Sequence, residues 1–232
     1  MQLEKVTKRG NAAVKRWYDD ACGTALALEF IGERWSLLIL RELMFGPRRF
    51  GEIKANLPGV SANVLTQRLE GLEESGILLK RKLATPGAVH VYELTPWGLE
   101  VEPIFQTMGR WATRSRRHDP TMYLSPASAM LSLRTMIDTG KAKAMRLTIA
   151  FRFPTDSFVG ELADGELTIR RGNTSAADVT FITDQTTFAF TVYGKLPFGA
   201  DSPTGMPLRV EGDVDAAYRF VDLFHLPEKI AD

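Results

Sequence analysis

Residues 61–75 restrict the fold of this chain most, because they have the pattern of a short amphipathic helix with clear ends. Ser61 is suited to cap the first turn, and Gly76 is suited to the left-handed conformation that ends many helices. Three apolar side chains recur at helical spacing and predict one buried face. They are Leu65, Leu69 and Leu72. Because most amphipathic helices are only structural, the assignment depends on the neighbouring segments.

Residues 50–57 predict another short helix, and only three residues, which include Gly59, separate it from residues 61–75. This spacing is typical of a helix-turn-helix, in which the second helix enters the major groove of DNA and the first supports it. The outward face of the second helix carries small polar groups that can hydrogen-bond base edges. The residues expected to contact bases are Ser61, Asn63, Thr66 and Gln67.

Two strand patterns, 77–83 and 89–94, surround a Pro86-Gly87 turn and predict a β-hairpin, or wing, directly after the second helix. Basic side chains there and nearby would contact phosphates, which fix the register on DNA and make affinity depend on salt. The predicted phosphate contacts are Arg48, Arg49, Arg68, Lys80, Arg81 and Lys82. Two of them have plainer alternatives: Arg68 in an ion pair with Glu52 or Glu73, and Lys82 as a solvated strand residue.

Further helices are expected on both sides of this motif. Residues 22–31 predict a helix with Leu26, Phe30 and Ile31 facing inward, and Ser36 is expected to cap a strongly apolar helix that Gly46-Pro47 ends. Residues 97–117 predict one longer helix, capped by Thr95-Pro96 and bent at Pro103. Its apolar stripe is Trp97, Val101, Ile104, Phe105, Met108 and Trp111.

Residues 20–117 resemble the HxlR family of bacterial transcriptional regulators, in order and in spacing. The motifs that carry the resemblance are Leu38-Ile39-Leu40-Arg41-Glu42-Leu43, Arg49-Phe50-Gly51-Glu52-Ile53, Leu65-Thr66-Gln67-Arg68-Leu69, and Tyr92 with Leu94-Thr95 and Gly98. The resemblance implies a winged helix-turn-helix and a homodimer, built through the first and last helices, on a pseudo-palindromic operator. The chain departs from the family at Gly23, where proline often follows the cysteine.

Cys22 is the only cysteine, which excludes an internal disulfide. One interpretation is a small buried residue at a helix start. The other is a redox-sensitive thiol, because a helix N-terminus lowers the pKa of a cysteine and favours the reactive thiolate. Any disulfide of Cys22 would then join two subunits or a small thiol.

The second half predicts an α+β domain. A Pro-containing segment, 118–129, has the composition of a linker, and Asp164-Gly165 is suited to a hairpin turn. The expected strands are 143–153, 157–162, 166–170, 179–183 and 208–211, and the expected helices are 130–137, 186–193 and 216–224. The predicted organisation is therefore a DNA-binding and dimerisation domain at 1–117, the linker, and a ligand-binding domain at 130–232.

Short motifs in this half resemble the sterol-carrier-protein fold. They are Asp164-Gly165 with Leu167 and Ile169, Ala177-Asp178-Val179-Thr180-Phe181, Gly194-Lys195-Leu196 and Val210-Glu211-Gly212-Asp213. The resemblance implies an apolar cavity between sheet and helices. Its candidate walls are Phe151, Phe153, Phe181, Phe188, Phe190, Phe220 and Phe224, with ordinary core packing as the alternative for each.

The net charge of +1 conceals an asymmetry, since residues 1–118 hold 18 Lys and Arg against 13 Asp and Glu, and residues 119–232 hold 11 against 15. A basic half suggests that only this part meets a polyanion. No apolar run reaches the length of a membrane span, and the start lacks a secretory signal pattern, so a cytoplasmic protein without membrane contact is expected. No catalytic, metal or cofactor motif is present, so we expect neither an enzyme nor a bound cofactor.

The sequence thus predicts a homodimeric, DNA-binding transcriptional regulator controlled by a hydrophobic small molecule or by thiol modification. The alternative is a lipid or small-molecule carrier that uses the winged helix only for dimerisation. An enzyme in the second half is a further rival, and the absence of a convergent polar set argues against it.

Overall fold

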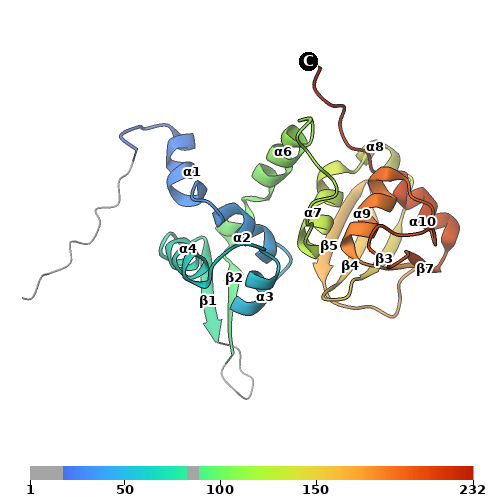
Figure 1. Ribbon diagram of the computed structural model, residues 1–232, viewed down its shortest axis with the longest axis horizontal. Helices are drawn as coiled ribbons and strands as arrows, with labels where there is room; N and C mark the ends of the chain where they lie inside the picture. Colours follow the sequence, from blue (N-terminus) through green and yellow to red (C-terminus); the bar gives the residue numbers. More distant parts are fainter. Residues whose placement is uncertain (1–17, 83–88, 232) are drawn as a thin grey trace, which may run out of the picture.

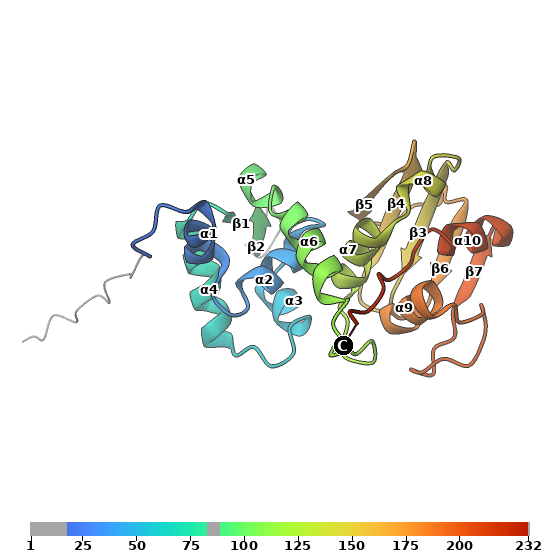
Figure 2. The ribbon, with the colours of Figure 1, turned by 90° about the horizontal axis from the view of Figure 1, so that it is seen from above.

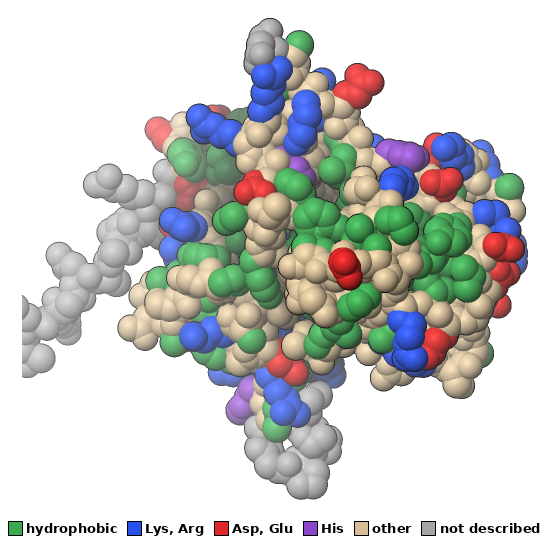
Figure 3. Space-filling view, turned by 45° about the vertical axis from the view of Figure 1, so that its right-hand side comes forward, with side chains coloured by type: hydrophobic (Ala, Val, Ile, Leu, Met, Phe, Trp, Pro, Cys, Tyr) green, Lys and Arg blue, Asp and Glu red, His purple; other side chains and the backbone are tan. Residues whose placement is uncertain are grey.

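The computed structural model describes residues 18–82 and 89–231, which form two halves lying side by side (Figures 1 and 2). The first half is mainly helical with a small hairpin, and the second is a sheet covered by helices. Within the described ranges, no helix combines the length and apolar character needed to cross a membrane. The same residues hold no group of three His, Cys, Asp or Glu suited to a metal ion. On the face shown in Figure 3, hydrophobic side chains form patches over both halves, with charged side chains mostly around them.

The first half has the predicted helix-turn-helix and wing. Helix α4 begins where Ser61 accepts a hydrogen bond from the backbone N–H of Val64 at 3.2 Å, and Gly76 follows its end with φ +73°. The wing strands pair antiparallel. The elements are α1 (Gly23–Ile31), α2 (Ser36–Leu43), α3 (Phe50–Ala55), α4 (Ala62–Glu74), β1 (Leu78–Lys82) and β2 (His90–Leu94).

Three expectations for this half are wrong. Ser36 is the first helical residue of α2, and Trp35, in a left-handed conformation with φ 81°, stands at the N-cap. The single long helix is two, α5 (Pro96–Leu99) and α6 (Glu102–Ala112), because Pro103 occupies the first turn of a new helix instead of bending an old one. Leu26 does not face inward but is largely exposed.

The second half is a mixed five-stranded sheet in the order β5-β4-β3-β6-β7, in which only β3 and β6 run parallel. The predicted hairpin at Asp164-Gly165 is present, and both residues have positive φ. The strands are β3 (Leu147–Arg152), β4 (Ser157–Ala163), β5 (Glu166–Arg171), β6 (Val179–Ile182) and β7 (Arg209–Gly212), and the helices are α7 (Pro126–Met136), α8 (Thr139–Ala142), α9 (Gln185–Gly194) and α10 (Val214–Val221).

Six of the seven phenylalanines expected to wall a cavity are buried and pack on one another. The ring of Phe151 lies 5.5 Å from Phe188 and 5.9 Å from Phe181, centroid to centroid, and Phe220 lies 5.0 Å from Phe224. These distances are those of a filled aromatic core, which is the packing alternative. Phe190 differs from the other six because it is half-buried and borders a surface hollow.

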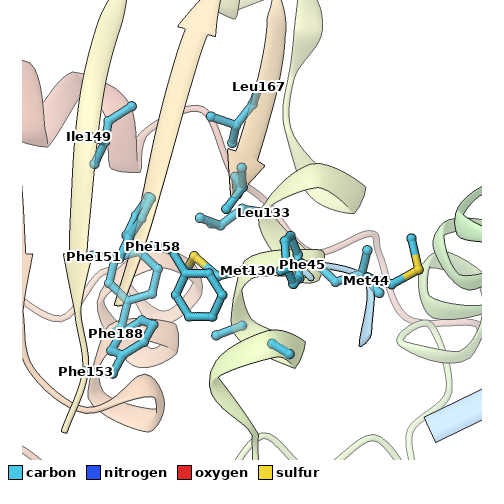
Figure 4. Packing of buried hydrophobic residues seen from close by; sticks show 14 of the residues in the cluster. Met44, Phe45, Met130, Leu133, Ile149, Phe151, Phe153, Phe158, Leu167 and Phe188 are labelled. Carbon is cyan, nitrogen blue, oxygen red and sulfur yellow. The ribbon is translucent and has the colours of Figure 1, made fainter. Parts of the chain in front are cut away.

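Helix α7 joins the two halves. It begins at Pro126, four residues before the expected Met130, because Ser125 caps it by accepting a hydrogen bond from Ser128 N–H at 3.1 Å. It packs against α2 and α6 on one side and against α9 and β5 on the other. Figure 4 shows the resulting continuity, with Phe45 of the first half beside Met130 and Leu133 of the second. The buried residues of both halves therefore form one cluster.

Candidate nucleic-acid interface

The outward face of α4 is polar and open. Leu65, Leu69 and Leu72 hold the opposite face in the core, where each is at most 1% exposed. This packing fixes the helix while its front turns point to solvent, which is the geometry that base recognition in a groove requires. All four residues predicted to contact bases are exposed, and so are Ala62 and Glu70 of the same helix. The four are Ser61, Asn63, Thr66 and Gln67.

Strand β1 carries the basic face of the wing. Lys80, Arg81 and Lys82 are all exposed in the strand that follows α4. Arg81 forms an ion pair with Glu93 on β2 at 2.6 Å, and the Lys80 ammonium lies 5.7 Å from the ring centroid of Tyr92. Both contacts hold the basic side chains close to the hairpin. The predicted turn at Pro86-Gly87 lies outside the described residues.

Arg48 and Arg49, adjacent in the turn before α3, have different environments. The Arg49 side chain is exposed, and its backbone N–H donates to Glu52 at 2.8 Å. Arg48 is buried and ion-paired with Asp156 of the second half, which Arg171 also contacts at 3.0 Å. Burial, with Arg171 nearby, lowers the pKa of Arg48 below its usual value. The expectation that Arg48 contacts a phosphate is therefore corrected: in this arrangement Arg48 joins the two halves.

Helices α1, α5 and α6 leave an apolar groove of about 330 Å³ exposed in the single chain. Leu26 and Phe30 from α1 face Trp97 and Ile104 across it, and the Phe30 and Trp97 rings meet edge to face at 5.5 Å. Farther along α6, Met108 is 47% and Trp111 is 74% exposed. A contiguous apolar surface of this kind marks an interaction site.

Residues 30–120 match the family described as HxlR-like helix-turn-helix. The HTH-type transcriptional regulator YodB of Bacillus subtilis is 37% identical over 86 residues, which cover 37% of this chain and 77% of YodB. The uncharacterized HTH-type transcriptional regulator YvaP of the same organism is 39% identical over 88 residues, which cover 38% of this chain and 81% of YvaP. The chain belongs to the HxlR family.

The resemblance of the first half to the HxlR regulators is thereby confirmed, whereas the sterol-carrier resemblance of the second half stays a prediction. The solved structure of reduced YodB from B. subtilis aligns with 43% of this chain and with 100% of the YodB chain, at 33% sequence identity and a TM-score of 0.39. The family match ends at residue 120, before α7 begins. In this HxlR-family chain, helix α7 and the sheet of the second half thus lie beyond the matched region.

Arg68 of this HxlR chain is only partly available to DNA. Its guanidinium forms an ion pair with Glu33 at 2.7 Å and donates to the Arg34 backbone carbonyl at 3.2 Å. An ion pair inside the domain was the plainer alternative, but its partner is Glu33 instead of Glu52 or Glu73. The contact attaches α4 to the corner between α1 and α2.

Cys22 stands at the N-cap of α1 and is exposed. In the single chain it is therefore not a buried packing residue. The backbone N–H groups of Thr24 and Ala25 lower the pKa of its thiol because they stabilise the thiolate. The geometry is compatible with a reactive thiol, and the sensing role stays a prediction.

The contacts between the two halves were not found from the sequence. Besides Arg48 with Asp156, they include the Ser125 hydroxyl, which donates to Glu42 at 2.6 Å, and the Phe45 and Phe158 rings at 5.5 Å. Ser125-Pro126 is a helix-start signature that could have indicated α7. The partners of Phe45 and Arg48, more than 100 residues away, have no local signal.

Proposed function

We propose that this HxlR-family chain is a homodimeric transcriptional regulator that binds double-stranded DNA through α4 and its wing. The observation that supports this most is the open polar face of α4 beside the exposed basic strand β1. Asn63 and Gln67 have amides that can bond base edges, while Lys80, Arg81, Lys82 and Arg49 are placed outward for phosphates. DNA binding is thus assigned to groups with no structural task in the core.

The proposed partner across the apolar groove of α1, α5 and α6 is a second copy of the chain. Isolated exposed apolar residues need no explanation, but here several lie along one continuous face. Covering them in a two-fold dimer would also place two α4 helices at a fixed separation, as half-sites about 34 Å apart require.

We propose that the second half receives the regulatory signal and that this signal is a hydrophobic small molecule. Its packing supports this role, since α7 contacts α6 directly and the Arg48–Asp156 pair reaches the turn before α3. A change in the second half would move elements that set the separation of the two α4 helices. Modification of Cys22 on α1 is a separate proposed input, because α1 borders the same groove.

The test is selection of bound sequences from random DNA with the full chain, followed by affinity measurements at several salt concentrations. The expected result is a pseudo-palindromic sequence and a steep loss of affinity with salt. Lys80→Ala should lower the salt slope by about one, and Lys141→Ala, an exposed lysine on α8, should leave it unchanged. A chain that selects no sequence and binds DNA without salt dependence would instead favour the carrier alternative.

A further inference from the structure

A second hollow, of about 430 Å³, lies where the two halves meet. One wall is the segment after α6, with Thr113 and Leu124; the other walls are α7, α9 and Leu226 of the C-terminal tail. In Figure 2 this tail runs across α7 and α9 toward the segment after α6. It is fastened there, since Ile230 N–H donates to the Arg114 carbonyl at 2.9 Å. The walls therefore belong to elements that are held against one another.

The size and lining of this interdomain pocket are those of a small-molecule site. Ligand pockets usually measure about 300–1,000 Å³ and are mostly apolar with a few polar groups. Leu124, Met136, Ala189 and Phe190 supply apolar lining. The aromatic core under the sheet is filled, so this pocket, and not that core, offers space in the second half.

Two residues of the wall, Ser132 and Tyr193, carry hydroxyl groups. The Tyr193 hydroxyl donates to Ser132 Oγ at 2.8 Å, and the Ser132 hydroxyl in turn donates to the Ala129 carbonyl at 2.7 Å. Both hydroxyl hydrogens are thereby used, so this pair offers a ligand only oxygen lone pairs. A ligand that donates a hydrogen bond fits these oxygens, and one that can only accept does not. We propose that this pocket binds a neutral, largely apolar small molecule that carries a hydroxyl group.

The charges around the pocket argue against an anionic ligand. Burial raises the pKa of Tyr193, which keeps its phenol neutral, and burial with nearby Lys229 lowers the pKa of His118, which favours the neutral imidazole. The Lys229 ammonium donates to the backbone carbonyls of Thr113 and Ser115, at 2.9 and 3.1 Å. A buried carboxylate would find no uncommitted cation among these groups, and burial without one is costly.

The regulatory consequence rests on the proposed function. Thr113 in the pocket wall is the C-cap of α6, and α6 carries Ile104 in the proposed dimer groove. A molecule wedged between this end of α6 and α9 would shift α6 against α7. The separation of the two α4 helices would then depend on whether the pocket is occupied, provided the ligand binds the two arrangements unequally.

The experiment measures binding of three related probes to the full chain by calorimetry: 2-naphthol, 2-methoxynaphthalene and 2-naphthoate. The first can donate a hydrogen bond, the second can only accept, and the third is charged. We expect 2-naphthol to bind roughly three- to tenfold more tightly than the methoxy compound, because one hydrogen bond is worth about 0.5–1.5 kcal/mol. The Tyr193→Phe, Ser132→Ala double variant, which removes both acceptor oxygens, should reduce this preference to within about twofold. Tyr218→Phe, at an exposed tyrosine on α10, should keep it.

Ala189→Phe adds a ring to the pocket lining and keeps both hydroxyl groups in the chain. It should abolish binding of all three probes, and it tests the pocket if the double variant fails to fold. The proposal is overturned if no probe binds, if the methoxy compound or the naphthoate binds as tightly as 2-naphthol, or if the pocket-filling variant still binds. DNA affinity of the same samples separates the two proposals. Intact DNA binding without probe binding would contradict only the proposed ligand pocket. Probe binding without DNA binding would contradict only the proposed role as a DNA-binding regulator.

Discussion

Asn63 and Lys80, two exposed side chains of the proposed DNA interface, differ in what they can recognise. An amide on α4 can distinguish bases because its donor and acceptor match a base edge, whereas an ammonium on β1 meets the same phosphate at every base pair. The sequence predicted that both are exposed, and both are, because each lies on the outward face of a strongly patterned element. The prediction failed for Arg48, since a basic residue in a turn looks the same whether its partner is a phosphate or Asp156.

Asn63→Ala should lower affinity for the selected operator by about 1–3 kcal/mol and leave affinity for random DNA nearly unchanged. The physical reason is the loss of base hydrogen bonds without loss of phosphate contacts. Fluorescence anisotropy on both DNAs measures the difference, with Asn173→Ala in the second half, also exposed, as the control. Equal losses on both DNAs would show that Asn63 does not read bases.

Arg48→Met and Arg49→Met should act in opposite ways although the residues are adjacent. The first should lower the free energy of unfolding by about 1–3 kcal/mol, because it removes one partner of a buried ion pair while Arg171 still contacts Asp156. The second should leave stability within about 0.5 kcal/mol, as for other exposed residues, and lower the salt slope of DNA binding. Denaturant titration and salt-dependent DNA binding test the two variants. The reverse pattern would show that Arg48 contacts a DNA phosphate.

Alkylation of Cys22 by iodoacetamide should reach its half-maximal rate at a lower pH than alkylation of free cysteine. The cause is the lowered thiol pKa, since the N–H groups of Thr24 and Ala25 stabilise the thiolate and extend its presence to lower pH. Cys22→Ser leaves the chain without a cysteine and gives the background rate. A midpoint equal to that of free cysteine would mean that the helix start does not activate the thiol.

Among the elements, β4 and β5 were predicted well, whereas the continuity of the long helix was wrong. The strand expected at 143–153 begins only at Leu147, because the chain before it leaves α8, a short helix that was not predicted. Alternation over β4 and β5 and the turn at Asp164-Gly165 are local signals, so their boundaries follow within one residue. The split between α5 and α6 was missed because a proline in the first turn of a new helix and a proline that bends one helix give the same local pattern.

Ile104→Glu on α6 should shift the dimer toward monomer, because it places a charge in the apolar groove of α1, α5 and α6. Operator affinity should fall with it, since one subunit engages one half-site. Sedimentation velocity across a concentration series measures the change. Val214→Glu on α10, a similarly exposed apolar residue outside the groove, should leave the dimer intact. Unchanged sedimentation of the Ile104 variant would place the dimer contact elsewhere.

At the scale of the whole molecule, the sequence predicted two domains and a linker, and the structure shows two halves with one continuous core. The apolar stripe of each element could be read locally. Which stripes meet could not, because the contact of Phe45 with Phe158 is a pairing between distant segments. The segment expected to separate the halves instead includes the first turn of α7, the helix that holds them together.

Because the two halves share one core, we expect the whole chain to unfold cooperatively. All four tryptophans, Trp17, Trp35, Trp97 and Trp111, belong to the first half, so their fluorescence follows that half while circular dichroism follows the whole chain. In the wild type the two denaturation curves should coincide, because the halves cannot expose their common core separately. Phe45→Ala should cost about 3–5 kcal/mol and separate the curves, since it removes the ring that contacts Phe158.

Ile53→Ala is the matched control, a truncation at a fully buried residue of α3 in the helix-turn-helix. It should shift both curves to lower denaturant by a comparable amount without separating them, because the contact between the halves is retained. Wild-type curves that already differ would show that the halves unfold independently. Signals from the second half could then reach α4 only through the covalent connection, and the coupling proposed for the interdomain pocket would lose its physical basis.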